Sequence, residues 1–170
     1  MRRLGVDPGE RRIGLALSDE DGRVAMPLKT LARASDDSTA RAIADEATAA
    51  AAAEIVVGLP LALDGSEGMA ARRARALASR IGALATSKVV MWDERLTTAA
   101  ATRALRDAGV RGRDQRAVVD QAAATLMLQC YLDASSGGTT WDPETDAAPE
   151  PARGRTRRGR GARGGRASRR

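Results

Sequence analysis

The sequence contains no histidine, no phenylalanine and only one cysteine among its 170 residues. Without histidine there is no imidazole for general acid or base catalysis or for zinc binding, and one cysteine cannot build a thiolate zinc cluster. Cys130 has no partner within the chain for a disulfide, which is typical of a reducing compartment, and its apolar helical surroundings predict a small core residue. Any enzyme chemistry must therefore use carboxylates, arginine, lysine and hydroxyl groups.

Aromatic residues make up 2% of the chain, whereas hydrophobic residues make up 43%. The core must therefore consist of Ala, Val, Leu and Ile. No run of about 18 apolar residues is present, so we expect no membrane span. Asp7 and Glu10 interrupt the apolar stretch that a signal peptide would need after the basic residues Arg2 and Arg3. We therefore expect a cytoplasmic protein.

The formal net charge of +6 is unevenly distributed. Residues 134–170 hold nine arginines and four acidic residues, which leaves 19 basic and 18 acidic residues in 1–133. The sequence therefore predicts one nearly neutral folded domain at 1–133 and a disordered Arg/Gly-rich tail at 134–170. Such a tail either binds nucleic acid backbones or only keeps the protein in solution.

The folded part predicts a mixed α/β domain with the order βββαβαβαα. Three antiparallel strands come first, and Pro27 suggests that the third is an edge strand. Two buried parallel strands follow, with helices that flank the sheet. The predicted strands are 4–7, 13–18, 23–30, 54–60 and 88–94, and the predicted helices are 35–53, 66–81, a segment ending near 108, and 114–133.

The first strand brings Asp7 to a turn formed by Pro8 and Gly9. Proline fixes its own φ and glycine can adopt a positive φ, so the chain should reverse and enter the next strand at Ile13. Taken alone, Asp7 is a candidate for an Asx turn. The turn is also similar to the first phosphate loop of the actin and sugar-kinase ATPases, but those enzymes need two large lobes and 133 residues provide one.

Two later segments carry carboxylates that could return to the same sheet edge. Asp93 and Glu94 end a strand, where open α/β sheets bind ligands, and only one of them can face a given site because strand residues alternate. Such a pair also occurs in turns and helix caps, and Thr97 is a natural cap for the next helix. Asp120 lies on an apolar helix face, so it needs an arginine partner such as Arg116, protonation or a metal ion.

Carboxylates that converge without histidine favour one or two Mg²⁺ or Mn²⁺ ions, because these prefer hard oxygen ligands. The reaction class that follows is phosphodiester hydrolysis. Arg12 and Arg95 flank the acids and are candidates for phosphate contacts, with ion pairs to the same acids as the alternative. Ser66, as the cap of the following helix, could help to hold a phosphate, or this segment could be only a tight connection.

Four motifs occur in order along residues 3–133. They are Asp-Pro-Gly at 7–9 with Arg-Ile-Gly-Leu-Ala at 12–16, Ile-Val-Val-Gly-Leu-Pro-Leu at 55–61 with Asp-Gly-Ser-Glu at 64–67, Asp-Glu-Arg-Leu-Thr-Thr at 93–98, and Val-Asp-Gln-Ala-Ala-Ala at 119–124. Together they resemble the YqgF-type pre-16S ribosomal RNA nuclease family, also called Holliday-junction-resolvase-like proteins. One departure is Pro8, where many members have a bulkier or aromatic residue.

The resemblance implies a ribonuclease H-like fold, in agreement with the predicted element order. It also implies catalytic, metal-binding acids at Asp7, Glu94 and Asp120, with Asp93 as a substitute for Glu94. The implied substrate is the precursor of 16S ribosomal RNA, trimmed at its 5′ end.

Two other functions remain open at this stage. The same site could cleave branched DNA as a Holliday-junction resolvase, which normally requires a symmetric dimer, so the chain is either a monomer or a homodimer. Alternatively, the domain could be an RNA-binding module of low activity that acts in transcription or ribosome assembly through its tail.

Overall fold

The computed structural model describes residues 1–96 and 113–136. Its elements are β1 (Arg3–Pro8), β2 (Arg12–Ser18), β3 (Ala25–Ala32), α1 (Asp36–Ala49), β4 (Glu54–Leu59), α2 (Met69–Leu84), β5 (Lys88–Asp93), a short 3-10 helix η1 (Glu94–Leu96) and α4 (Arg113–Ser136). The helix predicted to end near 108, its Thr97 cap and the predicted tail from 137 onward lie outside the described residues. The last helix continues three residues past the predicted domain boundary at 133.

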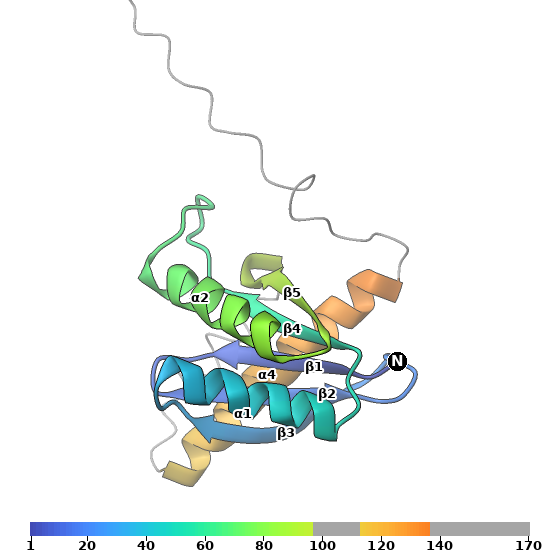
Figure 1. Ribbon diagram of the computed structural model, residues 1–170. Helices are drawn as coiled ribbons and strands as arrows, with labels where there is room; N and C mark the ends of the chain where they lie inside the picture. The colour runs from blue at the N-terminus through green and yellow to red at the C-terminus, as the bar shows by residue number, and fades with distance from the viewer. Residues whose placement is uncertain (97–112, 137–170) are drawn as a thin grey trace, which may run out of the picture.

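The five strands form one sheet in the order β3-β2-β1-β4-β5. β1 and β3 pair with β2 in antiparallel orientation, whereas β4 pairs in parallel with β1 and β5. Helices α1 and α2 cover one face of the sheet, and α4 crosses the other (Figure 1). The predicted arrangement of three antiparallel strands followed by two parallel strands is confirmed.

Alternation along the strands divides the core between the two faces of the sheet. On the side of α1 and α2, the cluster contains Leu4, Val6, Ile13, Leu15, Ile55 and Val57. On the side of α4, the cluster is smaller and contains Ala16, Val56, Trp92, Ala124, Leu128 and Leu132. Cys130 is partly buried and packs against this second cluster, as the sequence predicted.

Two element ends show how local sequence sets the boundaries. Pro27 lies in the edge strand β3, opposite a register shift in β2, which is where a residue without an N–H is tolerated. Ser35 caps α1 by accepting a hydrogen bond from the Ser38 N–H. The helix ends at Ala49, earlier than predicted, because Ala51 adopts a φ of 50° and the chain turns there toward β4.

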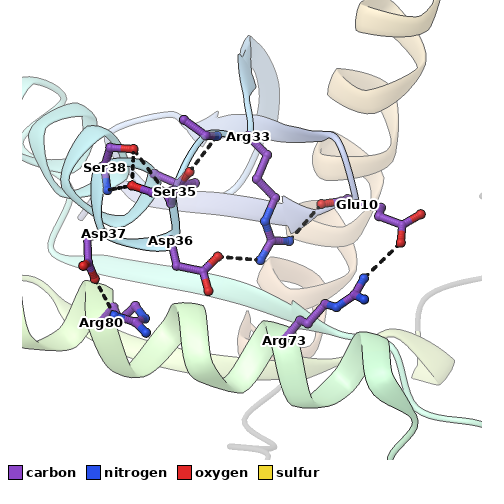
Figure 2. A network of polar contacts seen from close by, with 11 residues as sticks. Glu10, Arg33, Ser35, Asp36, Asp37, Ser38, Arg73 and Arg80 are labelled. Atoms are coloured by element: carbon purple, nitrogen blue, oxygen red, sulfur yellow. Dashed lines mark hydrogen bonds and ion pairs between the residues drawn. The ribbon is translucent and has the colours of Figure 1, made fainter.

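A polar network holds the turn after Asp7 against both helices of one face (Figure 2). The Arg33 guanidinium donates to the Gly9 carbonyl at 3.1 Å and to the Asp36 carboxylate at 3.0 Å. Arg73 of α2 binds Glu10 at 3.0 Å. The β1–β2 turn is therefore fixed from the side opposite α4.

Within residues 1–96 and 113–136, no helix is long and apolar enough to cross a membrane.

Candidate active site

Asp7 lies near the carboxyl end of β1, between glycines on both neighbouring strands. It pairs with Gly14 of β2. On its other side, Val6 pairs with Val57 of β4, so Gly58 is the next residue along. Asp7 shares the α4 face of the sheet with Gly5, two residues earlier. It is only 6% exposed, and the bond that closes the following turn runs from the Gly9 N–H to its main-chain oxygen.

Gly14 allows α4 to lie directly on this part of the sheet. A Cβ atom at Gly14 would collide with the carbonyl oxygen of Asp120, and a Cβ at Gly5 would lie 2.8 Å from the Cβ of Leu128. Glycine inside a strand is typical of such close backbone approach. Because Gly14 is the partner of Asp7, α4 brings Asp120 to the strand next to Asp7.

The Asp120 carboxylate binds Arg12, the first residue of β2. Arg12 Nε lies 2.7 Å from Asp120 Oδ2, and the two side chains are 31% and 26% exposed. The predicted ion pair between Asp120 and an arginine is therefore confirmed, whereas the Arg116 side chain lies outside the described residues. Arg12 precedes Gly14 by two positions in the strand, which places its side chain on the same face as Asp7.

Asp93 and Glu94 separate onto different sides of the sheet. Trp92 packs on the α4 side, so Asp93 is expected on the opposite face by alternation. Asp93 is 4% exposed and accepts bonds from the Arg95 side chain at 2.6 to 3.1 Å and from the Arg95 N–H at 2.9 Å. The hydrogen bond with Asp93 raises the pKa of the Arg95 guanidinium. For Asp93, the predicted turn role is confirmed.

Glu94 occupies the space above Gly58. A Cβ atom at Gly58 would lie 2.5 Å from Glu94 Oε1. Gly58 follows Val56 by two positions, and Val56 belongs to the cluster under α4, so this space is on the α4 face. Glu94, and not Asp93, therefore shares the face that carries Asp7.

The predicted role of Ser66 as a helix cap is wrong. α2 begins at Met69, and its N-cap is Gly68, which has no side chain to cap it. Ser66 instead donates from its hydroxyl and its N–H to Asp64 at 2.6 and 2.9 Å, and the hydroxyl bond lowers the pKa of the Asp64 carboxyl. An Asx turn at Asp64 thus satisfies these donors before the helix starts.

Arg95 lies between Asp93 and the loop that precedes α2. A Cβ atom at Gly65 would lie 3.2 Å from Arg95 Nη1. The guanidinium therefore contacts that loop while it binds Asp93, which is the ion-pair alternative considered for Arg95.

Three carboxylates, Asp7, Glu94 and Asp120, thus come from separate elements to one side of the sheet, at its edge where β1, β4 and β5 end. Their oxygens are the ligand type that Mg²⁺ and Mn²⁺ prefer. Within the part of the chain that is described, however, no three acidic or cysteine side chains lie close enough together to hold a metal ion. The three carboxylates are suitable ligands for a divalent ion, but the Asp120 carboxylate forms an ion pair with Arg12.

Gly14 and Gly58 are the site residues whose roles sequence reasoning missed. Both lie inside strands, where glycine has no side chain to pack. A glycine at such a position indicates that another group approaches the backbone closely. What the sequence could not show is that these two glycines flank Asp7, because that follows from the register of three strands.

Comparisons with known proteins agree on the relationship. The sequence profile of the RuvX family, described as Holliday junction resolvase, matches residues 1–134. A protein of Kineococcus radiotolerans named "Putative pre-16S rRNA nuclease" is 46% identical over 164 residues, which cover 95% of this chain and 87% of that protein. A protein of the same name from Nocardioides sp. is 48% identical over 136 residues, covering 77% of this chain and 86% of the relative.

A solved structure gives the same fold at much lower sequence identity. Thermus thermophilus RuvC in complex with a Holliday junction substrate superposes with a TM-score of 0.52 at 14% identity. The match covers 81% of this chain and 96% of RuvC. The ribonuclease H-like fold expected from the sequence is therefore confirmed.

Proposed function

This chain belongs to the RuvX family, and from that membership we propose that it is a metal-dependent nuclease that matures the 5′ end of the 16S ribosomal RNA precursor in the cytoplasm. The relatives' shared name supplies the substrate in this proposal. The observation that carries the chemistry is the buried Asp7, flanked by two glycines that leave room for Glu94 and for the Asp120 segment.

In this proposal Asp7, Glu94 and Asp120 are the catalytic acids and would hold one or two divalent ions. Such an ion supplies a Lewis acid that activates water and stabilises charge on the phosphate. Arg12, one-third exposed beside Asp120, would bind a backbone phosphate next to the scissile bond. Arg95 would keep η1, and with it Glu94, in place through its bonds to Asp93. Ser66 would contribute a hydroxyl near the substrate from the loop before α2.

The test is cleavage of an end-labelled 16S precursor by the full chain with Mg²⁺ or Mn²⁺. Asp7→Asn and Glu94→Gln should each lower the rate by at least about 100-fold, since losing even an outer-sphere partner of a metal site costs up to that much. Asp21→Asn removes the charge of an exposed turn residue far from the site and is the matched control. Unaltered cleavage by Asp7→Asn would refute the assignment.

A Holliday-junction resolvase is the second candidate, because the matching family is described by that activity. A synthetic four-way DNA junction belongs in the same assay. Paired cuts at symmetric positions, made by a dimer, would favour the resolvase. If neither substrate is cut, the RNA-binding module becomes the better explanation.

A further inference from the structure

The proposed function requires the protein to bind a divalent metal ion and a nucleic acid phosphate. The ion pair between Arg12 and Asp120 joins one residue from each of these two sites. Asp120 is one of the three proposed metal ligands, and Arg12 is the proposed phosphate contact. In the structure their side chains bind each other, with Nε and Oδ2 at 2.7 Å. Each group is therefore occupied by the other in the protein without substrate.

The pair is built so that it can open. Both side chains are partly exposed, Arg12 by 31% and Asp120 by 26%. The hydrogen bond from Arg12 Nε to Asp120 uses one guanidinium N–H of the five that arginine carries. Among the described residues, Asp120 is the one ion-pair partner of Arg12. The contact therefore lacks the two-pronged geometry of Arg95 with Asp93, where several bonds hold a carboxylate that is 4% exposed.

A phosphate group competes well for Arg12. Guanidinium groups bind phosphate oxygens through two parallel N–H bonds, which is a better match than a single bond to a carboxylate. Once Arg12 turns to a phosphate, the Asp120 carboxylate loses its cationic partner. The main chain of Asp120 lies over Gly14, the strand partner of Asp7, so the charge of its carboxylate becomes available to a metal ion at this end of the sheet.

We propose that Arg12 is a substrate-operated gate on the metal site: it occupies Asp120 until a nucleic acid phosphate binds Arg12 and releases Asp120 to the divalent ion. This inference rests on the proposed function. The linkage is reciprocal, because a cation on Asp120 repels the guanidinium and frees it for phosphate. Metal and nucleic acid then bind cooperatively, and the free protein holds the metal weakly.

The deciding measurement is Mn²⁺ binding to the full chain without nucleic acid. The concentration of free Mn²⁺ is monitored by its electron paramagnetic resonance signal. Arg12→Gln should bind Mn²⁺ about tenfold more tightly than wild type, within the usual range of coupling between two sites. Asp120→Asn in the Arg12→Gln background should remove this gain. Arg80→Gln, which breaks the Arg80–Asp37 pair between α2 and α1 on the other face of the sheet, is the matched control for the loss of one positive charge and should leave the affinity unchanged.

Adding a single-stranded RNA with uncleavable phosphorothioate linkages provides the second arm. It should strengthen Mn²⁺ binding by wild type by a larger factor than binding by Arg12→Gln, because the variant has no gate to open. Equal factors in the two proteins would overturn the inference.

The outcomes separate this inference from the proposed function. If wild type binds Mn²⁺ and Arg12→Gln binds it equally or more weakly, Arg12 only positions Asp120 and the gate is overturned, while the metal-dependent nuclease stands. If no variant binds Mn²⁺ with or without RNA, both the gate and the metal dependence fail.

Discussion

At the scale of single residues, the surroundings of Asp7 depend on two neighbouring glycines that have no side chain. Gly14 and Gly58 flank it on adjacent strands, and each makes room for a different group on the face under α4. A side chain at either position would displace a carboxylate or the helix that carries one. The two glycines thus affect the proposed chemistry through the positions of Glu94 and of α4.

Gly58→Ala tests this for Glu94. The new Cβ would lie 2.5 Å from Glu94 Oε1, at the far end of a flexible side chain, so the carboxylate should move and the strand should not. We expect the free energy of unfolding to change by less than about 1 kcal/mol, and cleavage of the RNA precursor to fall by roughly tenfold or more, as when a metal-site partner is disturbed.

Gly82→Ala in α2 is the control for Gly58→Ala. Its nearest contact would be Val89 Cγ2 at 3.8 Å, an ordinary packing distance, and alanine favours the helix. This variant should retain full activity with equal or higher stability. If Gly58→Ala were equally active, Glu94 would not need its present position.

The titration of Tyr131 should change the free energy of unfolding at high pH. Its hydroxyl donates to Glu54 at 2.7 Å, and Glu54 also binds Arg3 at 3.1 Å. Burial, and then the bond to Glu54, raises the pKa of Tyr131 from 10.0 to about 12. The unfolded chain therefore loses this proton at lower pH than the folded protein, so the free energy of unfolding should fall as the pH rises from 10 to 12.

Tyr131→Phe removes that titration. At pH 7 the variant should be less stable by about 1.5–3 kcal/mol, the value of a hydrogen bond to a charged group. Between pH 10 and 12 the difference from wild type should shrink, because only wild type loses stability through Tyr131. Urea denaturation at several pH values measures both effects, and a constant difference across the range would contradict the pKa assignment.

At the scale of elements, the contact of α4 with β1 and β2 determines where Asp120 lies relative to the sheet. α4 approaches the strands through glycine, so backbone faces backbone there, whereas its carboxyl-terminal half packs through side chains. Trp92 and Tyr131 meet edge to face at 5.3 Å in that half. The rigid contact at Asp120 and the side-chain contacts further along together fix the helix on the sheet.

Gly14→Ala and Gly5→Ala should therefore differ in cost. At Gly14 the new Cβ would lie 2.1 Å from the carbonyl oxygen of Asp120, whereas at Gly5 it would lie 2.8 Å from the Cβ of Leu128. Both atoms are fixed by the helix backbone, so α4 must move in both variants, and it must move further in Gly14→Ala. We expect Gly14→Ala to lower the free energy of unfolding by about 1–3 kcal/mol and Gly5→Ala to cost less. Thermal and urea unfolding of both variants give the order, and a larger cost at Gly5 would contradict the argument.

At the scale of the whole molecule, charge separates the chain into two parts. The nine arginines of the tail all lie in 153–170, beyond the last described helix, whereas residues 1–133 are nearly neutral. We propose that the domain performs the chemistry and that the tail adds electrostatic affinity for nucleic acid.

A chain ending at Ser136, where α4 ends, tests this division. It should melt at the same temperature as the full chain and still cleave the precursor at saturating RNA. Its affinity for RNA should be lower, and the dependence of the logarithm of affinity on that of salt should be less steep, since up to nine phosphate contacts are lost. Loss of cleavage at saturating RNA would instead favour the RNA-binding module.

The sequence by itself determined the elements and their order. Apolar alternation, β-branched runs and turn residues such as Pro8 and Gly9 act locally, so the mixed sheet and the edge position of β3 could be predicted. The absence of histidine and the positions of the acids also limited the chemistry before any contact was known.

Only the tertiary structure decided which side chains meet. The pairing of Arg12 with Asp120 joins positions 108 apart, the choice of Glu94 over Asp93 depends on which face β5 presents to α4, and the flanking of Asp7 depends on the register of β2 and β4. These contacts follow from strand register and helix approach, which are set by packing of the whole domain and have no local signal beyond a glycine inside a strand.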